Sequence, residues 1–356
     1  MNNQLYVILP DSSPSLQLTK MLKAAIGTYD AKIIDSSSNN YNLQNKKILF
    51  CLELNEFGFD LKMLSYLSFL CNSRKDIFNG STGALLVHSR TELYTKRAAQ
   101  DIIFICNSLG CSFIGQPLVE ATINLKNFLT WQKTMHYSLD YICLELCEKL
   151  ITRLMQNTPT ILANPKLTVL FSTPHKTSNT MDLWKMVKKN LKGCEFDEIQ
   201  IENGKIHDCN GCSFKTCLHY SKQNTCFYGG AIVESVLHSI EMANTIVWLC
   251  PNYNDALSAN ITAMINRLTV LYRKINFHSK NIFCIIVSGN SGSDSIAKQL
   301  IGALNINKGF RLPSGAFLLE TANDPLSILK VKLINHTAKC FAQNMLNQIN
   351  IFESQK

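Results

Sequence analysis

Two stretches of this sequence repeat the same order of apolar and polar residues. LYVILPDSSPSLQLTKML, from Leu5, parallels LTVLFSTPHKTSNTMDLW, from Leu167. Further along, GALLVHSRTELYTKRAAQDIIFICNSLG parallels IFCIIVSGNSGSDSIAKQLIGALNINKG, and GQPLVEAT parallels GAFLLETA. Self-similarity at a long period is the sign of a duplicated structural unit. We therefore expect two tandem copies of one fold.

Each copy alternates short apolar runs with longer amphipathic stretches. This alternation predicts an α/β fold with a parallel sheet, because buried parallel strands are apolar on both faces. In the second copy the predicted strands are 167–171, 196–201, 245–250, 282–287 and 316–320. One predicted helix buries Trp184, Val187 and Leu191 and ends at Gly193. Two more cover about 258–273 and 293–307.

The two copies differ in length at one place. Val7 corresponds to Val169, an offset of 162 residues, whereas Glu120 corresponds to Glu320, an offset of 200. The extra residues must lie in the middle of the second copy, where a cysteine-rich stretch occupies about 202–230. The prolines and polar residues of 156–166 predict a boundary between the copies. The predicted domains are 1–158 and 165–352.

The composition limits the cell compartment and the partners. With 35 basic and 26 acidic residues the net charge is +9, but no dense basic run predicts a nucleic-acid site. No signal peptide or membrane-spanning stretch is evident, so we expect a cytoplasmic protein with no membrane partner. In that compartment the fourteen cysteines predict reduced thiols, metal ligands or redox groups instead of disulfides. Six of them, Cys51, Cys106, Cys143, Cys147, Cys250 and Cys284, are expected in the core.

Three loops of the second copy follow predicted strands and would meet at one edge of the sheet. The first is STPHKTSNT (172–180), which is rich in hydroxyl groups and precedes a helix. Such a loop suits a phosphate at a helix N-terminus, and it suits an ordinary Ser/Thr helix cap equally well. The second is CPNYNDALSAN (250–260), and the third is VSGNSGSDS (287–295). Gly289 and Gly292 would allow the backbone to approach a ligand closely.

The stretch DCNGCSFKTCLHYSKQNTC contains Cys209, Cys212, Cys217 and Cys226. Four thiolates are suitable ligands for an iron–sulfur cluster. They also suit zinc, although zinc sites more often have two Cys-x2-Cys pairs, and only Cys209 and Cys212 form one here. Free or redox-active thiols are the third alternative.

The three loops resemble those of the NADPH-dependent FMN reductases, a family with a flavodoxin-like fold. STPHKTSNT resembles the phosphate loop of that family. PNYNDALSANITAMINR resembles its Pro-x-Tyr loop and the helix that follows, which in the family ends in an Asp-Arg-like pair and here ends in Asn266 and Arg267. A Cys-x-x-Cys insertion ahead of that loop looks like the iron–sulfur flavoprotein branch. The resemblance covers roughly 165–325. It implies a doubly wound parallel five-stranded sheet in each copy, bound FMN, and NAD(P)H as co-substrate.

The resemblance also implies residue roles. The phosphate of FMN would be bound by Ser172, His175, Ser178, Asn179 and Thr180, with His175 standing where the family usually has Arg or Lys. The flavin ring would contact Pro251, Asn252, Tyr253, Asn254, Ser288 and Gly289. The four cysteines of the insertion would hold a [4Fe-4S] cluster. No catalytic acid or base is expected, because the flavin carries the chemistry.

The first copy departs from this pattern. It keeps Ser12 and Ser13 but has Asp11 in the loop, where a carboxylate would repel phosphate. The segment LELNEFGFD (52–60) contains acids and no Pro-x-Tyr. We expect the first copy to bind no flavin and to act as a structural or dimer-like partner. The expected assembly is either a homo-oligomer or a pseudo-dimer within the chain.

The predicted function is therefore electron transfer from NAD(P)H through FMN to a quinone, a nitro compound or a redox protein. Two alternatives remain at this point. One is a non-enzymatic iron–sulfur flavoprotein that only carries electrons. The other is a zinc-stabilised binding module that has lost flavin.

Overall fold

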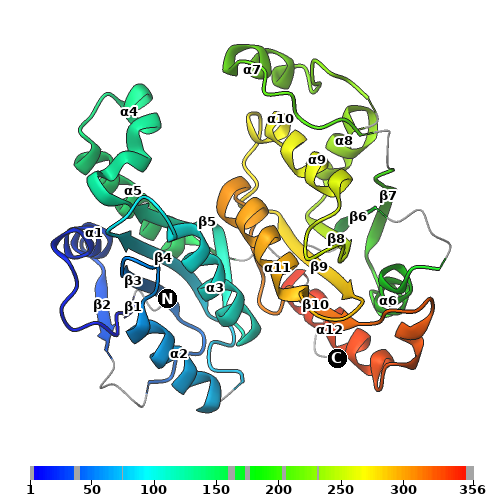
Figure 1. The fold of residues 1–356 in the computed structure, drawn as a ribbon, viewed down its shortest axis with the longest axis horizontal. Helices are drawn as coiled ribbons and strands as arrows, with labels where there is room; N and C mark the ends of the chain where they lie inside the picture. Colours follow the sequence, from blue (N-terminus) through cyan, green and yellow to red (C-terminus); the bar gives the residue numbers. More distant parts are fainter. Residues whose placement is uncertain are drawn as a thin grey trace. The chain divides into compact units, whose positions relative to one another are not determined.

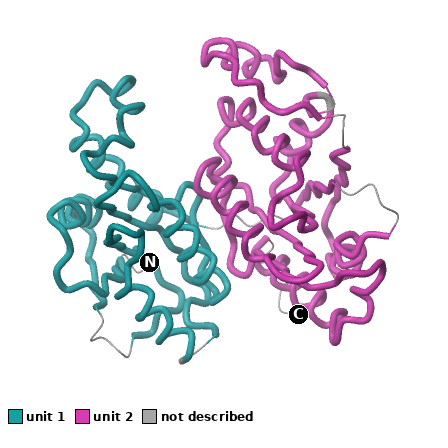
Figure 2. Tube along the Cα trace, viewed as in Figure 1, with its two compact units in different colours: residues 1–158 teal, residues 159–356 magenta. Residues whose placement is uncertain are grey.

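The computed structural model describes residues 4–35, 41–73, 75–158, 165–172, 177–202, 206–230 and 232–349. It consists of two compact units, Met1–Thr158 and Pro159–Lys356 (Figure 2). We call them unit 1 and unit 2.

Unit 1 is a five-stranded parallel sheet flanked by helices (Figure 1). Its strands are β1 Gln4–Ile8, β2 Asp30–Ile34, β3 Lys47–Leu54, β4 Thr82–Ser89 and β5 Ser112–Ala121. Its helices are α1 Leu16–Ile26, α2 Leu61–Ser73, α3 Thr95–Ser108, η1 Ile123–Phe128, α4 Leu129–Met135 and α5 Leu139–Gln156.

Unit 2 has the same architecture. Its strands are β6 Lys166–Phe171, β7 Glu195–Gln200, β8 Thr245–Pro251, β9 Asn281–Ser288 and β10 Phe317–Thr321, close to the five predicted ranges. Its helices are α6 Asn179–Lys188, α7 Phe214–Lys222, η2 Ile232–Val236, α8 Leu237–Met242, α9 Ala259–Arg267, α10 Thr269–Tyr272, α11 Ser293–Leu300, η3 Ile301–Lys308, η4 Ser327–Lys330 and α12 Ile334–Ile349.

The two sheets have one topology. Unit 1 has the order β2-β1-β3-β4-β5 and unit 2 the order β10-β9-β8-β6-β7, which is the same order read from the other edge. This is the flavodoxin-like doubly wound order, so the predicted fold class is confirmed. In each unit the first and last helices pack together, α1 with α5 and α6 with α12. The shared order and helix pairing are consistent with two tandem copies.

The cores follow from the apolar strands. Every residue of β9 is buried, and β4 is buried except at His88, as expected for inner strands covered on both faces. The six cysteines predicted for the core are fully or almost fully buried. In unit 1, Cys143 and Cys147 of α5 lie in the same apolar cluster as Leu18 and Met21 of α1. These thiols therefore serve packing.

The connection that carries the four cysteines distinguishes the units. In unit 1, β2 and β3 are joined by residues 35–46, whereas 201–244 join β7 and β8 in unit 2. The longer connection contains α7, the π-helical turn η2 and α8. The extra length therefore lies between the second and third strands, where the offsets predict it.

Candidate functional site

The loops predicted to bind a ligand lie at the carboxyl edge of the unit 2 sheet. In a doubly wound sheet the ligand crevice forms where the strand order reverses, which here is between β6 and β8. The loops after β6, β8, β9 and β10 all leave this edge. The site can therefore be built from residues that are far apart in the sequence.

Ser172 directly follows β6 and has an unusual environment. Its side chain is buried, and its Oγ has no hydrogen-bond partner among the described residues. A buried hydroxyl without a partner costs free energy unless a ligand or water satisfies it. This orphaned hydroxyl at the carboxyl end of a central strand fits a phosphate oxygen. His175, the other predicted side chain of this loop, lies outside the described residues.

The N-terminus of α6 provides the rest of the predicted phosphate site. Ser178 caps the helix, and its Oγ accepts the Met181 N–H at 3.3 Å. The first amides of a helix have no intrahelical acceptor, and the helix dipole favours an anion there. Ser178 is thus already used as a cap, and Thr180 is buried on the inner side of the helix. Among the described residues of this loop, the first backbone amides of α6 and Ser172 Oγ remain as candidates to meet a phosphate.

Asn179 has a role that the sequence did not indicate. Its Nδ2 donates to the carbonyls of Ala322 at 3.0 Å and Asp324 at 2.9 Å, and its Oδ1 accepts the Ile328 N–H at 3.3 Å. The side chain therefore ties the start of α6 to the loop after β10. Any contact between Asn179 and a phosphate would come from its backbone N–H.

Asn252 organises the loop after β8. Its Nδ2 lies 3.1 Å from Asp255 Oδ1, 3.1 Å from Ser288 Oγ and 3.0 Å from the Ser291 carbonyl. Its Oδ1 accepts the N–H of Asp255, three residues further on, at 2.8 Å, which fixes the turn after β8. One asparagine therefore holds the loops after β8 and β9 together.

The exposed part of this loop presents Tyr253 and Asn254. Tyr253 is 45% exposed and pairs through its backbone with Ala256. Asn254 and Asp255 have positive φ values of 54° and 56°, which turn the chain sharply after Pro251. The phenol ring is thus available as a wall for a planar ligand.

The loop after β9 completes an open pocket. Ser288 is buried, and its Oγ hydrogen-bonds Ser293 Oγ at 2.6 Å, so this hydroxyl supports the loop. Gly289 lies against Asn323, whose Oδ1 would be 2.9 Å from a Cβ at that position. The pocket has a volume of about 410 Å³ and is lined by Asn252, Asn254, Asp255, Gly289, Asn290 and Asn323.

The pocket includes residues that the sequence analysis missed. Asn290 and Asp255 lie within the quoted loops but were not assigned a role, and Asn323 follows β10. The position of Asn323 directly after a strand of the same sheet was the signal available. The described lining carries one carboxylate and no basic side chain.

The four cysteines of the insertion differ in how deeply they are buried. Cys217 is buried, Cys212 and Cys226 are half-buried, and Cys209 is exposed. The pKa of Cys212 is raised by burial and by the neighbouring Cys217, to which it hydrogen-bonds, with smaller effects from Cys209 and Cys226. In the described ranges, no group of three or more His, Cys, Asp or Glu side chains is arranged to hold a metal ion. The donor set suits a metal, but closing it around an ion would require the thiols to move.

The insertion is fixed to the helices that follow the pocket. Asn260 of α9 donates to the Ile201 carbonyl, where the insertion begins. Ser221 of α7 donates to the Val270 carbonyl of α10 at 2.7 Å. The insertion is therefore anchored to α9 and α10, the two helices that follow the Tyr253 loop in the chain.

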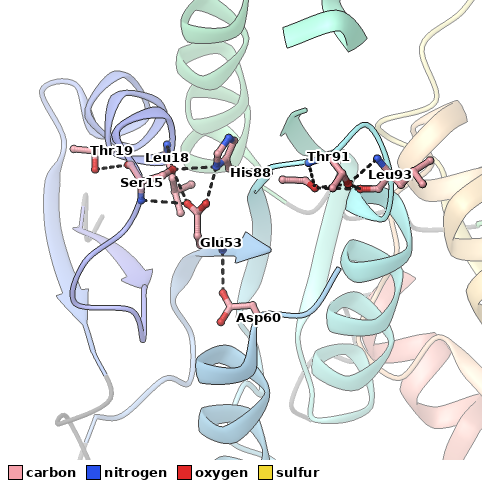
Figure 3. A network of polar contacts seen from close by, with 9 residues as sticks. Ser15, Leu18, Thr19, Glu53, Asp60, His88, Thr91 and Leu93 are labelled. Atoms are coloured by element: carbon pink, nitrogen blue, oxygen red, sulfur yellow. Dashed lines mark hydrogen bonds and ion pairs between the residues drawn. The ribbon is translucent and has the colours of Figure 1, made fainter. Parts of the chain in front are cut away.

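The corresponding edge of unit 1 is filled by the unit's own acids (Figure 3). Glu53, at the end of β3, accepts hydrogen bonds from Ser15 Oγ at 2.6 Å and from the Ser15 N–H at 3.3 Å. Ser15 caps α1, as Ser178 caps α6. His88 Nδ1 lies 2.7 Å from Glu53 and 3.0 Å from Ser15 Oγ. A carboxylate thus lies at the N-terminus of α1, the helix end that corresponds to the predicted phosphate site at α6 of unit 2.

This unit 1 network is not a hydrolase triad. Ser15 and Glu53 contact the same ring nitrogen of His88, whereas a triad uses both nitrogens. Ser15 Oγ also accepts the Leu18 N–H as the helix cap. Asp11, the acid noted in the sequence, pairs with Lys62 at 2.5 Å. The arrangement supports a structural role.

Residues 165–324 match the family model of the NADPH-dependent FMN reductases. The match lies within unit 2 and includes the pocket and the cysteine segment. A comparison with curated protein sequences finds no match.

Solved structures resemble about half of the chain. The NAD(P)H:quinone oxidoreductase from Methanothermobacter marburgensis is 13% identical, covering 51% of this chain and 96% of its own, with a TM-score of 0.38. The FMN-dependent NADH-azoreductase from Bacillus anthracis str. Ames Ancestor, in complex with FMN, is 10% identical, covering 52% and 98%, with a TM-score of 0.36. The Trp repressor binding protein from Bacillus subtilis is 15% identical, covering 49% and 98%, with a TM-score of 0.35. At these identities and scores, the likenesses indicate neither substrate nor partner.

No helix in the described ranges is long and apolar enough to cross a lipid bilayer.

Proposed function

We propose that unit 2 binds FMN and acts as an NAD(P)H-dependent FMN reductase-type oxidoreductase. The observation that carries the proposal is the match of residues 165–324 to the FMN reductase family. Two features of the same unit support it. The first is the orphaned Ser172 hydroxyl before α6, and the second is the pocket between the loops after β8 and β9.

The residues present fit the cofactor. Ser172 Oγ and the first amides of α6 would bind the phosphate, and Ser178 and Asn179 would hold that helix end in place. Tyr253 and Asn254 would line the ring, while Asn252 and Ser288 keep the two ring loops joined. When bound, FMN supplies a centre that accepts a hydride from a nicotinamide and passes electrons to a quinone, a nitro compound or a redox protein.

The test is an absorption spectrum of the full chain purified anaerobically and supplied with FMN, followed by NADH and NADPH oxidation assays with quinone and nitro acceptors. We expect bound flavin and acceptor-dependent oxidation of at least one nicotinamide. Bound flavin with no turnover of either nicotinamide would instead favour an electron carrier. A chain that binds no FMN would overturn the proposal.

We propose further that unit 1 binds no flavin. The Glu53 carboxylate occupies the N-terminus of α1, and its charge would repel a phosphate there. Titration of the full chain should therefore saturate at one FMN per chain. Saturation at two would contradict this assignment.

We also propose that Cys209, Cys212, Cys217 and Cys226 form a metal site, with an iron–sulfur cluster as the leading occupant. Support comes from the donor set itself, four cysteines within one short segment, and from the contact between Cys212 and Cys217. Four thiolates suit a cluster, and a nearby flavin would give it a redox partner. Iron, sulfide and zinc analysis of the anaerobic protein distinguishes the occupants. Iron with sulfide would support the cluster, whereas stoichiometric zinc would show that the site holds zinc instead.

A further inference from the structure

The most deeply buried cation near the cysteine segment is Arg267. It is the last residue of α9, and its side chain is 2% exposed. Its Nη1 donates to the His207 carbonyl at 3.1 Å, and its Nη2 donates to the Gly229 carbonyl at 2.8 Å. His207 lies two residues before Cys209, and Gly229 lies three residues after Cys226. One guanidinium therefore bridges the two ends of the cysteine segment.

The chemistry of this contact argues for positioning. Guanidinium is a planar fork whose donors are held in fixed directions, so two acceptors bound to it are also fixed relative to each other. Both of these acceptors are neutral carbonyl oxygens, and the Arg267 Nε is buried without a partner in the described structure. Burying a cation without a carboxylate is costly, so a gain in stability does not explain the residue. What the contact does provide is a constant separation of the two segment ends.

The neighbouring residue reinforces the first of these ends. Asn266 Nδ2 donates to Asp208 Oδ1 at 2.9 Å, and the same oxygen accepts the Cys209 N–H at 2.6 Å. The backbone at Cys209 is thus fixed from α9 through Asp208. Asn266 and Arg267 therefore act together on the position of the first cysteine.

We propose that Arg267 is the positioning residue of the cysteine segment. It fixes the backbone at His207 and Gly229, on either side of the four cysteines, and so limits how the thiols can rearrange around a thiophilic metal ion. This inference rests on the proposed cysteine site. It adds a physical link, because α9 begins beside the flavin loop at Ser258 and ends at the guanidinium that closes the segment.

The test compares Arg267→Gln and Arg267→Lys with Arg311→Gln in the reduced full chain. Arg311 is the matched control, because it is a buried arginine of unit 2 whose Nη1 donates to neutral Asn281 Oδ1 at 3.1 Å, beside the start of β9. Circular dichroism and FMN binding report on folding. Labelling of each cysteine by iodoacetamide, followed by peptide mass spectrometry, reports on the segment without metal. Titration with Co²⁺ reports on the metal site through its thiolate charge-transfer absorption.

We expect Cys209 and Cys226 to be labelled several-fold faster in Arg267→Gln than in the native chain. We expect Co²⁺ affinity to fall about tenfold or more, the size usual for residues that orient metal ligands. Arg267→Lys should restore the labelling rates and the Co²⁺ affinity only in part, since a single ammonium cannot donate to both carbonyls as the guanidinium does. Arg311→Gln should change neither the labelling rates nor the Co²⁺ affinity. If Arg267→Gln does not fold, the same two measurements on Arg267→Lys decide the question.

Unchanged labelling rates and Co²⁺ affinity in a folded Arg267 variant would overturn the inference. A native chain that takes up no Co²⁺ would overturn the proposed metal site. In that case the labelling rates still decide the role of Arg267, so the two failures are distinguishable.

Discussion

The Asn179 side chain donates to the Ala322 carbonyl at 3.0 Å and so joins the start of α6 to the loop after β10. The same amide contacts the carbonyl of Asp324 and the N–H of Ile328. This loop carries Asn323, which lines the pocket and faces Gly289. The phosphate end and the ring end of the proposed flavin site therefore depend on one side chain.

Replacing Asn179 with Ala should weaken FMN binding and lower the stability of unit 2. The three lost hydrogen bonds contribute about 1 kcal/mol each, so we expect a loss of roughly 3 kcal/mol in the free energy of unfolding. Asn344→Ala is the control, because Asn344 similarly joins α12 to the Ser314 and Gly315 carbonyls, before β10. Denaturant unfolding and FMN titration check the prediction. Equal FMN affinity in the two variants would count against a role for Asn179 at the site.

Ser172→Ala should weaken FMN binding with little change in stability. A hydrogen bond to a charged phosphate contributes about 1.5–3 kcal/mol, so the Kd should rise roughly ten- to a hundredfold. Thr245→Val is the matched control. Thr245 Oγ1 is also buried without a partner among the described residues, but it lies at the amino end of β8, away from the carboxyl edge that carries the site. Fluorescence titration with FMN provides the measurement. The prediction fails if both variants bind FMN as the native chain does.

Gly292→Ala should disrupt the loops that Asn252 joins. Gly292 has a φ of +86°, and a Cβ there would lie 1.9 Å from Asp255 Oδ1. Gly193→Ala is the control, since Gly193 has a φ of +75° and nothing within 4 Å of the added Cβ. The left-handed backbone costs about 1–2 kcal/mol at either position. Only Gly292→Ala should lower the free energy of unfolding by more than this and also weaken FMN binding. Thermal unfolding with and without FMN measures both effects.

Glu53 should make the stability of unit 1 depend on pH. Burial works to raise the pKa of this carboxyl, but hydrogen bonds from His88 and Ser15 prevail and hold it below its usual value. A carboxyl with a lowered pKa contributes stability above its unfolded pKa, near 4.5, and loses it as the pH falls through the folded pKa. The pKa of Asp60 shifts in the opposite direction, because burial raises it.

Glu53→Gln should therefore destabilise unit 1 at pH 7 and flatten the acid limb of its stability profile. Thermal unfolding between about pH 3 and pH 7 measures this, since the unfolded carboxyl titrates within that range. Glu56→Gln, at an exposed position of the adjacent loop, is the control. An acid limb that is the same in the native chain and in Glu53→Gln would show that Glu53 does not contribute.

Much of the fold could be predicted from the sequence because buried parallel strands are short and apolar. The runs at 245–250 and 282–287 could not be solvent-facing strands, and they became the inner strands β8 and β9. The length difference between the copies likewise located the cysteine insertion. The loops after the strands could be assigned to one edge of the sheet, because the carboxyl ends of parallel strands all lie there.

The contacts that build the site depend on residues far apart in the chain. Asn179 meets Ala322 across 143 positions, and Arg267 meets His207 across 60. No local pattern marks such pairs, because the same Asn or Arg could equally cap a helix or face solvent. In unit 1 the acids of 52–60 were visible, but only the fold brings Glu53 to the N-terminus of α1. The sequence by itself determined the two units, their strands and the loops at their edges. Tertiary structure alone decided which polar groups are bonded within the protein and which, like the Ser172 hydroxyl, have no partner among the described residues.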